Sequence, residues 1–318
     1  MELPYFYGNS IFINQEKLNM LKKAFFLSLI ATVPLYGQQK TKEKETEIKE
    51  VVVTATRSQK KLKDVPITVQ VVTAEDIKKS QSTDFKTFLE NEFSGINFTY
   101  DGGSPNINMM GFGGKYVLFL MNGERMAGET FDNIDYDRID IDNIERIEII
   151  KGASSSLYGS NAIGGVINII TKDSKSPLDI NAGYLYDNSR DHKVNLSVGT
   201  KQKWGNLSIS SFYKMREPYI IKDRISTGGI YNELNVAGFT NYGINPKLTF
   251  NLSPKINFSL TPGYYFSERN PGTPASKIVR EQYYNYNLGL KTNIKFNDNQ
   301  NLIVSGTFDR YDKYDYFR

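Results

Sequence analysis

Segments in which apolar and polar residues alternate fill the second half of the chain, and they constrain its fold more than any other feature. In residues 256–266, for example, Ile256, Phe258 and Leu260 alternate with polar residues. A strand of this kind has one apolar and one polar face, and about ten residues suffice to cross a bilayer. The pattern predicts an antiparallel transmembrane sheet, with a soluble antiparallel sandwich, which also alternates, as the alternative.

The alternation predicts seven strands, near residues 178–187, 192–200, 205–214, 238–251, 256–266, 283–296 and 301–310. Three connections at one end are tight (201–204, 253–255 and 297–300), whereas the other end has two long ones (215–237 and 267–282) and a short one (188–191). Outer-membrane barrels have short periplasmic turns and long extracellular loops, so the first strand should run outward. Barrels with a filled lumen have about 22 strands, and an open sheet edge is costly in lipid. We therefore expect residues 176–318 to be the N-terminal part of a longer β-barrel.

The composition excludes several classes of protein. The chain has no cysteine and a single histidine, His192, so disulfides, thiolate metal sites and histidine-rich metal sites are excluded. A net charge of +4 does not suggest a nucleic-acid partner. The 21 tyrosines and 19 phenylalanines favour a barrel, whose apolar band is flanked by aromatic girdles. Residues 50–172 contain no Ser/His/Asp or Cys/His set and no Walker loop, so we expect neither an enzyme nor a bound cofactor.

The N-terminal region has the pattern of a secretory signal peptide at residues 20–37. Lys22 and Lys23 precede an apolar core at 24–33, which is too short for a membrane span; a buried helix is the alternative. Residues 1–19 precede this complete signal, so we expect translation to start at Met20. Residues 38–57 follow as a charged linker. It carries a short β-prone run, formed by Glu50, Val51, Val52, Val53, Thr54 and Ala55.

Two apolar runs, 147–150 and 166–170, flank a centre rich in glycine and serine. Taken alone, they predict a buried β-hairpin of any α/β domain. The full stretch IERIEIIKGASSSLYGSNAIGGVINIITK resembles the end of the plug domain of TonB-dependent outer-membrane receptors. The resemblance rests on Glu148, Lys151, Gly152, Tyr158, Gly159, Gly164 and Gly165, and upstream on Gly111, Asn122, Gly123 and Arg125.

The resemblance implies an α+β plug domain at residues 58–175, followed by a partial antiparallel transmembrane β-barrel. Within the plug we expect strands at 66–72 and 95–100, and a hairpin turn at Asn122–Gly123. Short helices are expected at 74–79 and 84–90, with Thr73 and Thr83 as N-caps.

Two features of the plug segment need a separate interpretation. Met110 stands where the family usually has an arginine, so an ion pair that anchors the plug would be absent or moved. The carboxylates of residues 132–142 lack the spacing and the central glycine of a calcium loop. We therefore expect them to form a solvated face. They are Asp132, Asp135, Asp137, Asp140 and Asp142.

The resemblance also implies a function: uptake of a metal complex or cofactor, such as siderophore-bound iron, haem or cobalamin, across the bacterial outer membrane. The run Glu50–Ala55 would be the TonB box, which pairs with the TonB energy-transducing protein by strand addition. By position, the candidate ligand-facing residues are Tyr100, Asp101, Phe112, Lys115, Tyr219 and Tyr231. A passive pore, an adhesin or a non-functional truncated receptor are the alternatives.

Overall fold

The computed structural model describes residues 52–53, 60–61, 68–101, 104–126, 134–152, 158–187, 190–224, 231–270, 278–297 and 300–317. All described residues belong to one compact unit, which spans residues 50–318. The expected signal peptide and start site therefore lie outside the described residues. Across the described ranges, no helix is both long and apolar enough to cross a membrane.

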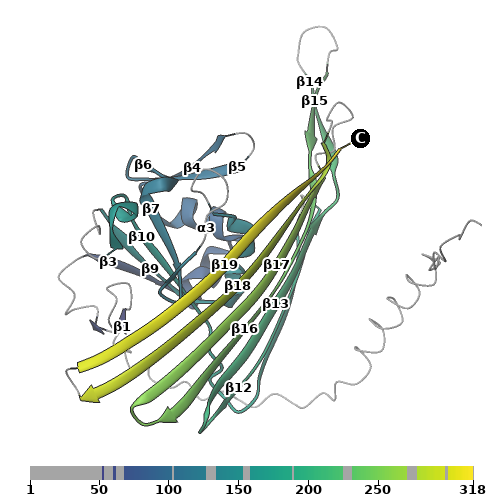
Figure 1. Ribbon diagram of the computed structural model, residues 1–318. Coiled ribbons are helices and arrows are strands. Elements are labelled where there is room, and N and C mark those ends of the chain that lie inside the picture. Colours follow the sequence, from purple (N-terminus) through teal and green to yellow (C-terminus); the bar gives the residue numbers. More distant parts are fainter. Residues whose placement is uncertain are drawn as a thin grey trace, which may run out of the picture. The chain divides into compact units, whose positions relative to one another are not determined.

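A five-stranded mixed sheet forms the centre of the plug (Figure 1). Its strand order is β3 (Val69–Thr73), β9 (Ile144–Lys151), β10 (Gly165–Thr171), β7 (Val117–Met121) and β8 (Glu124–Arg125). Strand β10 pairs antiparallel with β9 and parallel with β7. The two apolar runs of the sequence are therefore paired strands, as predicted. Their continuous apolar character follows from burial on both faces of the sheet.

Two short helices, α2 (Ala74–Ser80) and α3 (Phe85–Glu92), complete the core of the plug. Phe85, Phe88 and Leu89 of α3 are almost completely buried, in one cluster with Ile149 and Ile167 of the sheet. Burying an apolar side chain of this size stabilises the fold by about 1.5–3 kcal/mol. This cluster is therefore the main source of stability within the plug.

The N-caps of the two helices were predicted with mixed success. Thr73 caps α2 in a capping box with Asp76, as predicted. The prediction of Thr83 as the cap of α3 was wrong, because Asp84 takes that place. Its carboxylate accepts hydrogen bonds from the Thr87 backbone N–H and hydroxyl, both at 2.8 Å. A charged acceptor is also favoured by the positive end of the helix dipole.

Smaller elements surround this core. A three-stranded sheet contains β4 (Ile96–Asp101), β5 (Ser104–Met109) and β6 (Phe112–Gly113), and β1 (Val52–Val53) pairs with β2 (Lys60–Lys61). Short 3-10 helices lie at η2 (Gly114–Tyr116), η4 (Tyr136–Arg138), η5 (Ile141–Asn143) and η6 (Ser160–Ala162).

A seven-stranded antiparallel sheet forms the barrel wall, and Figure 1 shows β12, β13 and β16 to β19 running side by side. The strands are β11 (Asp179–Tyr186), β12 (Asp191–Gln202), β13 (Gly205–Arg216), β16 (Gly238–Ser253), β17 (Ile256–Asn270), β18 (Ile278–Asn297) and β19 (Gln300–Phe317), in that order. Seven strands were predicted at these places. Within the described residues the sheet is not closed, because β11 and β19 lie at its two edges.

The two long connections were predicted to be loops, and this was partly wrong. Residues 215–237 contain a hairpin of β14 (Tyr219–Arg224) and β15 (Tyr231–Val236). Strands β17 and β18 also extend into the expected loop 267–282, where Glu268 pairs with Gln282. The backbone pairing continues beyond the apolar part of the strands. Because the residues there are polar, the sequence pattern predicted a loop, although the strands continue. We call this end of the sheet the loop end, and the end with the tight connections the turn end.

Aromatic residues mark two levels on the face of the sheet that points away from the plug. Near the loop end, the Tyr242 ring lies 4.9 Å from Phe266, and Tyr264 lies 5.2 Å from Tyr286, between ring centroids. Near the turn end, Phe250 packs against Phe258. Phe258 and Phe266 are eight positions apart on β17, or about 26 Å at about 3.3 Å per residue. At the strand tilt of about 35–45° in outer-membrane barrels this is a height of about 20 Å, which fits within the apolar band of about 25 Å between their aromatic girdles.

Candidate functional site

A cavity of about 410 Å³ lies between the plug and the loop end of the barrel wall. We call it the outer cavity. The plug contributes the N-terminus of α3, part of β5 and residues 134–137, and the barrel contributes the loop ends of β12, β13, β16 and β17. Its charged lining consists of Asp84, Lys86, Asp135, Asp137, Asp187, Asp191, Lys193, Lys214, Arg216 and Arg269.

Asp135 connects the plug to the barrel at the floor of this cavity. Its carboxylate accepts hydrogen bonds from the hydroxyls of Tyr265, at 3.2 Å, and Tyr311, at 2.8 Å. The Arg269 guanidinium lies 3.5 Å from the same oxygen. Asp135 is buried, so the prediction of a solvated face was wrong for it. A buried carboxylate is tolerated because a cation and two hydroxyls compensate it.

Asp137 lies beside these residues and lines the outer cavity. The Arg269 guanidinium is 3.9 Å from its carboxylate. Burial of the carboxyl group, and next the negative charge of Asp135, raise the pKa of Asp137 above its ordinary value. Ionisation of this carboxyl group is therefore less favourable than in water.

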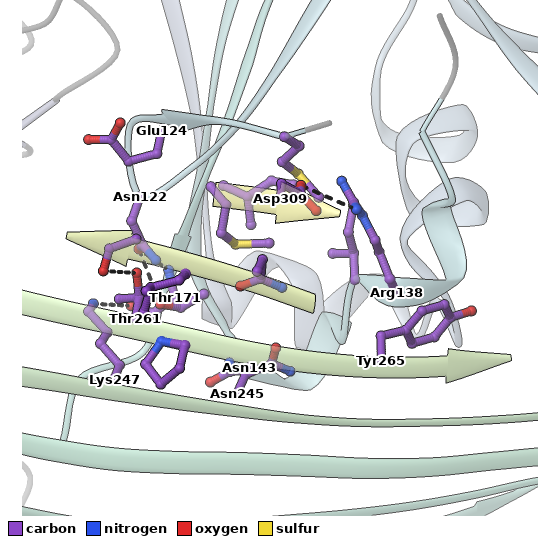
Figure 2. Close-up of a pocket in the computed structure, with 18 of the residues that line it drawn as sticks. Asn122, Glu124, Arg138, Asn143, Thr171, Asn245, Lys247, Thr261, Tyr265 and Asp309 are labelled. Atoms are coloured by element: carbon purple, nitrogen blue, oxygen red, sulfur yellow. Dashed lines mark hydrogen bonds and ion pairs between the residues drawn. The ribbon is translucent and has the colours of Figure 1, made fainter. Parts of the chain in front are cut away.

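Two further contacts join the same plug segment to the barrel. Arg138 lies 3.5 Å from Asp309 of β19 (Figure 2). Lys193 of β12 lies 3.2 Å from Asp140 and also pairs with Asp142. Asp140 is buried as well, so a solvated face was wrong for this residue too. Residues 135–142 are therefore the charged anchor of the plug against the wall.

Met110 does not take part in this anchor. It lies more than half exposed in the turn between β5 and β6, with φ of 54°. The plug carries its buried arginine at Arg138 instead. Whether this contact replaces the one expected at position 110 stays a prediction.

A smaller cavity of about 120 Å³ lies deeper between plug and wall, and Figure 2 shows part of its lining. Asn122 Oδ1 accepts hydrogen bonds from the Thr171 backbone N–H at 3.0 Å and from its hydroxyl at 3.1 Å. Lys247 Nζ donates to the Thr171 carbonyl at 3.2 Å, and Lys291 Nζ donates to the Asn122 carbonyl at 3.3 Å. These contacts fix the end of the plug sheet to β16 and β18.

The plug motif residues have structural roles in this arrangement. Asn122 and Gly123 form the predicted turn between β7 and β8, with φ of 54° and 85°, a conformation that favours glycine at the second position. The Gly123 N–H donates to Asn168 Oδ1, and Asn168 Nδ2 donates to the fully buried Glu148. A Cβ at Gly165 would lie 2.4 Å from the Ile150 carbonyl, so only glycine fits there.

The other motif residues lie around this framework. Lys151 Nζ donates to the Ser94 carbonyl at 3.2 Å. Tyr158 is half-buried and packs against a second apolar cluster of the plug, which consists of Val69, Leu118, Leu120, Ile150, Ala162 and Val166. Arg125 is exposed on β8. Gly111, Gly152 and Gly159 have positive φ, whereas Gly164 is buried against Phe112.

The structure does not bring the candidate ligand-facing residues together at the outer cavity. Phe112 and Lys115 are exposed near η2, and Tyr219 is half-buried at the start of β14. None of these three lines the cavity. For Tyr100, Asp101 and Tyr231 the structure gives backbone pairing only, in β4 and β15.

Only part of the predicted TonB box is described. Val52 and Val53 are extended in β1 and pair with Lys61 and Lys60. Glu50, Val51, Thr54 and Ala55 lie outside the described residues. The cavity-lining residues Lys214 and Arg269 were missed by the sequence analysis, because they stand at polar positions of alternating strands, where any polar residue fits the pattern.

Comparisons with known proteins agree with this architecture. Residues 61–166 match the family model of the TonB-dependent receptor plug domain. The vitamin B12 transporter BtuB of Vibrio cholerae is 34% identical over 148 residues, which are 46% of this chain and 23% of the transporter. The iron-regulated outer membrane virulence protein of Vibrio cholerae is 35% identical over 153 residues, with the same shares of 46% and 23%.

A solved structure extends the likeness to the barrel wall. The ferric enterobactin receptor of Pseudomonas aeruginosa superposes with a TM-score of 0.60 and 17% identity, over 76% of this chain and 41% of the receptor. The chain thus spans less than half the length of these relatives. Residues 61–166 are thus a plug domain of the TonB-dependent receptor family, and the wall that follows has the fold of the barrel in a receptor of this kind.

Proposed function

We propose that the protein takes part in TonB-dependent active transport of a metal complex or cofactor across the outer membrane. The observation that carries this proposal is a plug held against a barrel wall by charged contacts, above which an outer cavity opens at the loop end. Uptake requires a cavity that binds the ligand and a plug that moves to let it pass, whereas an adhesin requires neither a ligand cavity nor a plug. The names of the relatives, a vitamin B12 transporter and an iron-regulated protein, support a scarce metal-containing ligand.

The outer cavity is the ligand site in this proposal. Its volume of about 410 Å³ falls within the range of small-molecule sites, about 300–1,000 Å³. Plug and barrel both line it, so a bound ligand contacts both at once. The proposed ligand-facing residues would contact the parts of a ligand that extend beyond the cavity, because Phe112, Lys115 and Tyr219 do not line it. They are Tyr100, Asp101, Phe112, Lys115, Tyr219 and Tyr231.

The TonB energy-transducing protein is the second proposed partner. The segment from Glu50 to Ala55 would add as a strand to an exposed sheet edge of that protein, through main-chain hydrogen bonds. The extended conformation of Val52 and Val53 is compatible with this pairing. Catalysis forms no part of the proposal.

Energy dependence separates this proposal from a passive pore. The protein should be expressed from its own gene in a bacterium that lacks other receptors for iron chelates and cobalamin. Uptake of labelled ligand should then stop on addition of a protonophore or on deletion of the host's TonB protein. Binding to isolated outer membranes should persist under both conditions. Uptake that continues unchanged would favour the passive pore.

A further inference from the structure

Lys214 of β13 is a buried cation without a carboxylate partner among the described residues. Its relative exposure is 8%, and it lines the outer cavity. Its Nζ lies 5.2 Å from the centre of the buried Phe212 ring, a cation–π contact. Within the described ranges, no ion pair joins Lys214 to an acid. A buried charge without a counter-ion is costly, which makes this position unusual.

The other cations of the outer cavity are each compensated. Arg216 pairs with Asp191, and Arg269 with Asp135. Lys193 pairs with Asp140 and Asp142, and Lys86 with Glu90 on the same helix. Lys214 is thus the exception within one cavity.

The neighbours of Lys214 in the sheet do not offset its charge. Its cross-strand partners are Lys193 on β12 and Asn241 on β16. Like charges directly opposite each other in a sheet are destabilising. Asp137 attracts Lys214 only from beyond ion-pair distance.

From this geometry, and resting on the proposed transport function, we infer that Lys214 binds an anionic oxygen group of the transported ligand. The ligand class is then a metal chelate with catecholate or carboxylate oxygens and net negative charge, rather than an uncharged corrinoid. The ammonium group supplies charge-assisted hydrogen bonds to the anionic oxygen, and Phe212 holds the lysine stem beneath the cavity. Anion binding offsets the cost of the buried charge.

Equilibrium binding to outer membranes that contain the full chain tests this inference. The probes are ferric enterobactin and ferric citrate, which are anionic chelates, and cyanocobalamin, which has no net charge. We expect at least one anionic chelate to bind to the wild-type protein and cyanocobalamin not to bind. Lys214→Met should weaken chelate binding by about tenfold or more, as expected for loss of a charged hydrogen bond.

Three controls make the result specific. Lys214→Arg keeps the charge and should retain most of the affinity. Lys201→Met removes an exposed lysine at the turn end and should leave binding unchanged. Thermal unfolding of Lys214→Met should show no loss of stability, because methionine removes a buried charge while keeping the side-chain length.

The inference is overturned if neither anionic chelate binds, or if Lys214→Met binds the chelate as the wild type does. Binding of cyanocobalamin alone would also overturn it, yet would leave the transport proposal standing. Loss of energy-dependent uptake, with chelate binding at Lys214 intact, would instead remove the transport function and keep the anion site.

Discussion

Arg138 in the plug lies 3.5 Å from Asp309 in the barrel wall, with side-chain exposures of only 5% and 15%. The two residues are far apart in the sequence, and their ion pair joins the plug to β19, the seventh strand of the sheet. Together with the Asp135 and Lys193 contacts, it gives the plug a charged attachment rather than an apolar one. Under the proposed transport function such an attachment suits the plug, because water can replace its charged partners when the plug rearranges.

Breaking this pair on one side should destabilise the protein. Arg138→Leu removes the cation that faces Asp309, and loss of one partner of a buried pair costs about 3–5 kcal/mol. The double variant Arg138→Leu/Asp309→Leu should recover most of that loss, since it removes both charges. Denaturant unfolding of the full chain in detergent gives the free energies for the double-mutant cycle.

Arg125→Leu is the matched control, because Arg125 is exposed on the same domain. Its effect should stay within about 0.5 kcal/mol. Equal stability of Arg138→Leu and the wild type would contradict the anchoring role.

Asp137→Asn should stabilise the protein at neutral pH. The pKa of Asp137 is raised by burial and by Asp135, so its ionised form weakens the folded state. The stability associated with protonated Asp137 is present at low pH and is lost as the pH rises through the raised pKa. The melting temperature of Asp137→Asn should therefore exceed that of the wild type at pH 7, and the two should converge below about pH 4.

Asp142→Asn provides the comparison for that experiment. Asp142 pairs with Lys193, so its replacement should not stabilise the protein at neutral pH. A lower melting temperature of Asp137→Asn at pH 7 would show that its attraction to Arg269 outweighs the burial and repulsion.

Much of this architecture could be predicted from the sequence, because period-two alternation reflects two different environments on the faces of a strand. In β17, Tyr264 and Phe266 lie on one face and the buried Tyr265 on the other, toward Asp135. The strand ends were less predictable. Polar pairs such as Glu268 with Gln282 continue the ladder without an apolar signal.

The charged anchor could not be predicted, for a different reason. Asp135 and Asp140 occur in an acidic stretch that is typical of a solvated face, and their partners Arg269 and Lys193 lie on strands that follow much later. Local pattern carries no information on which distant strand faces a given side chain. The same limit hid Lys214, whose position in the alternation looks like that of any polar residue.

The two parts of the chain should behave differently in water. Residues 38–318 carry the lipid-facing side of the sheet, with exposed Leu196, Tyr286 and Phe308, and two open edges. Exposed apolar faces and open edges favour aggregation. We expect this chain to require detergent, whereas residues 50–172 should be a soluble monomer around their own core. Size-exclusion chromatography of both decides this, and a detergent-free monomer of the longer chain would contradict a membrane-inserted sheet.

The most direct test of TonB-dependent transport is the behaviour of Val52→Pro. Proline removes one backbone donor and blocks strand pairing at that position, whereas Val52→Ala keeps the donor and serves as the control. Uptake and binding of labelled ferric chelate should be measured in the same cells, with the protein expressed from its own gene. We predict that Val52→Pro abolishes energised uptake with unchanged binding, and that Val52→Ala retains both. Uptake by Val52→Pro at the wild-type rate would contradict this prediction.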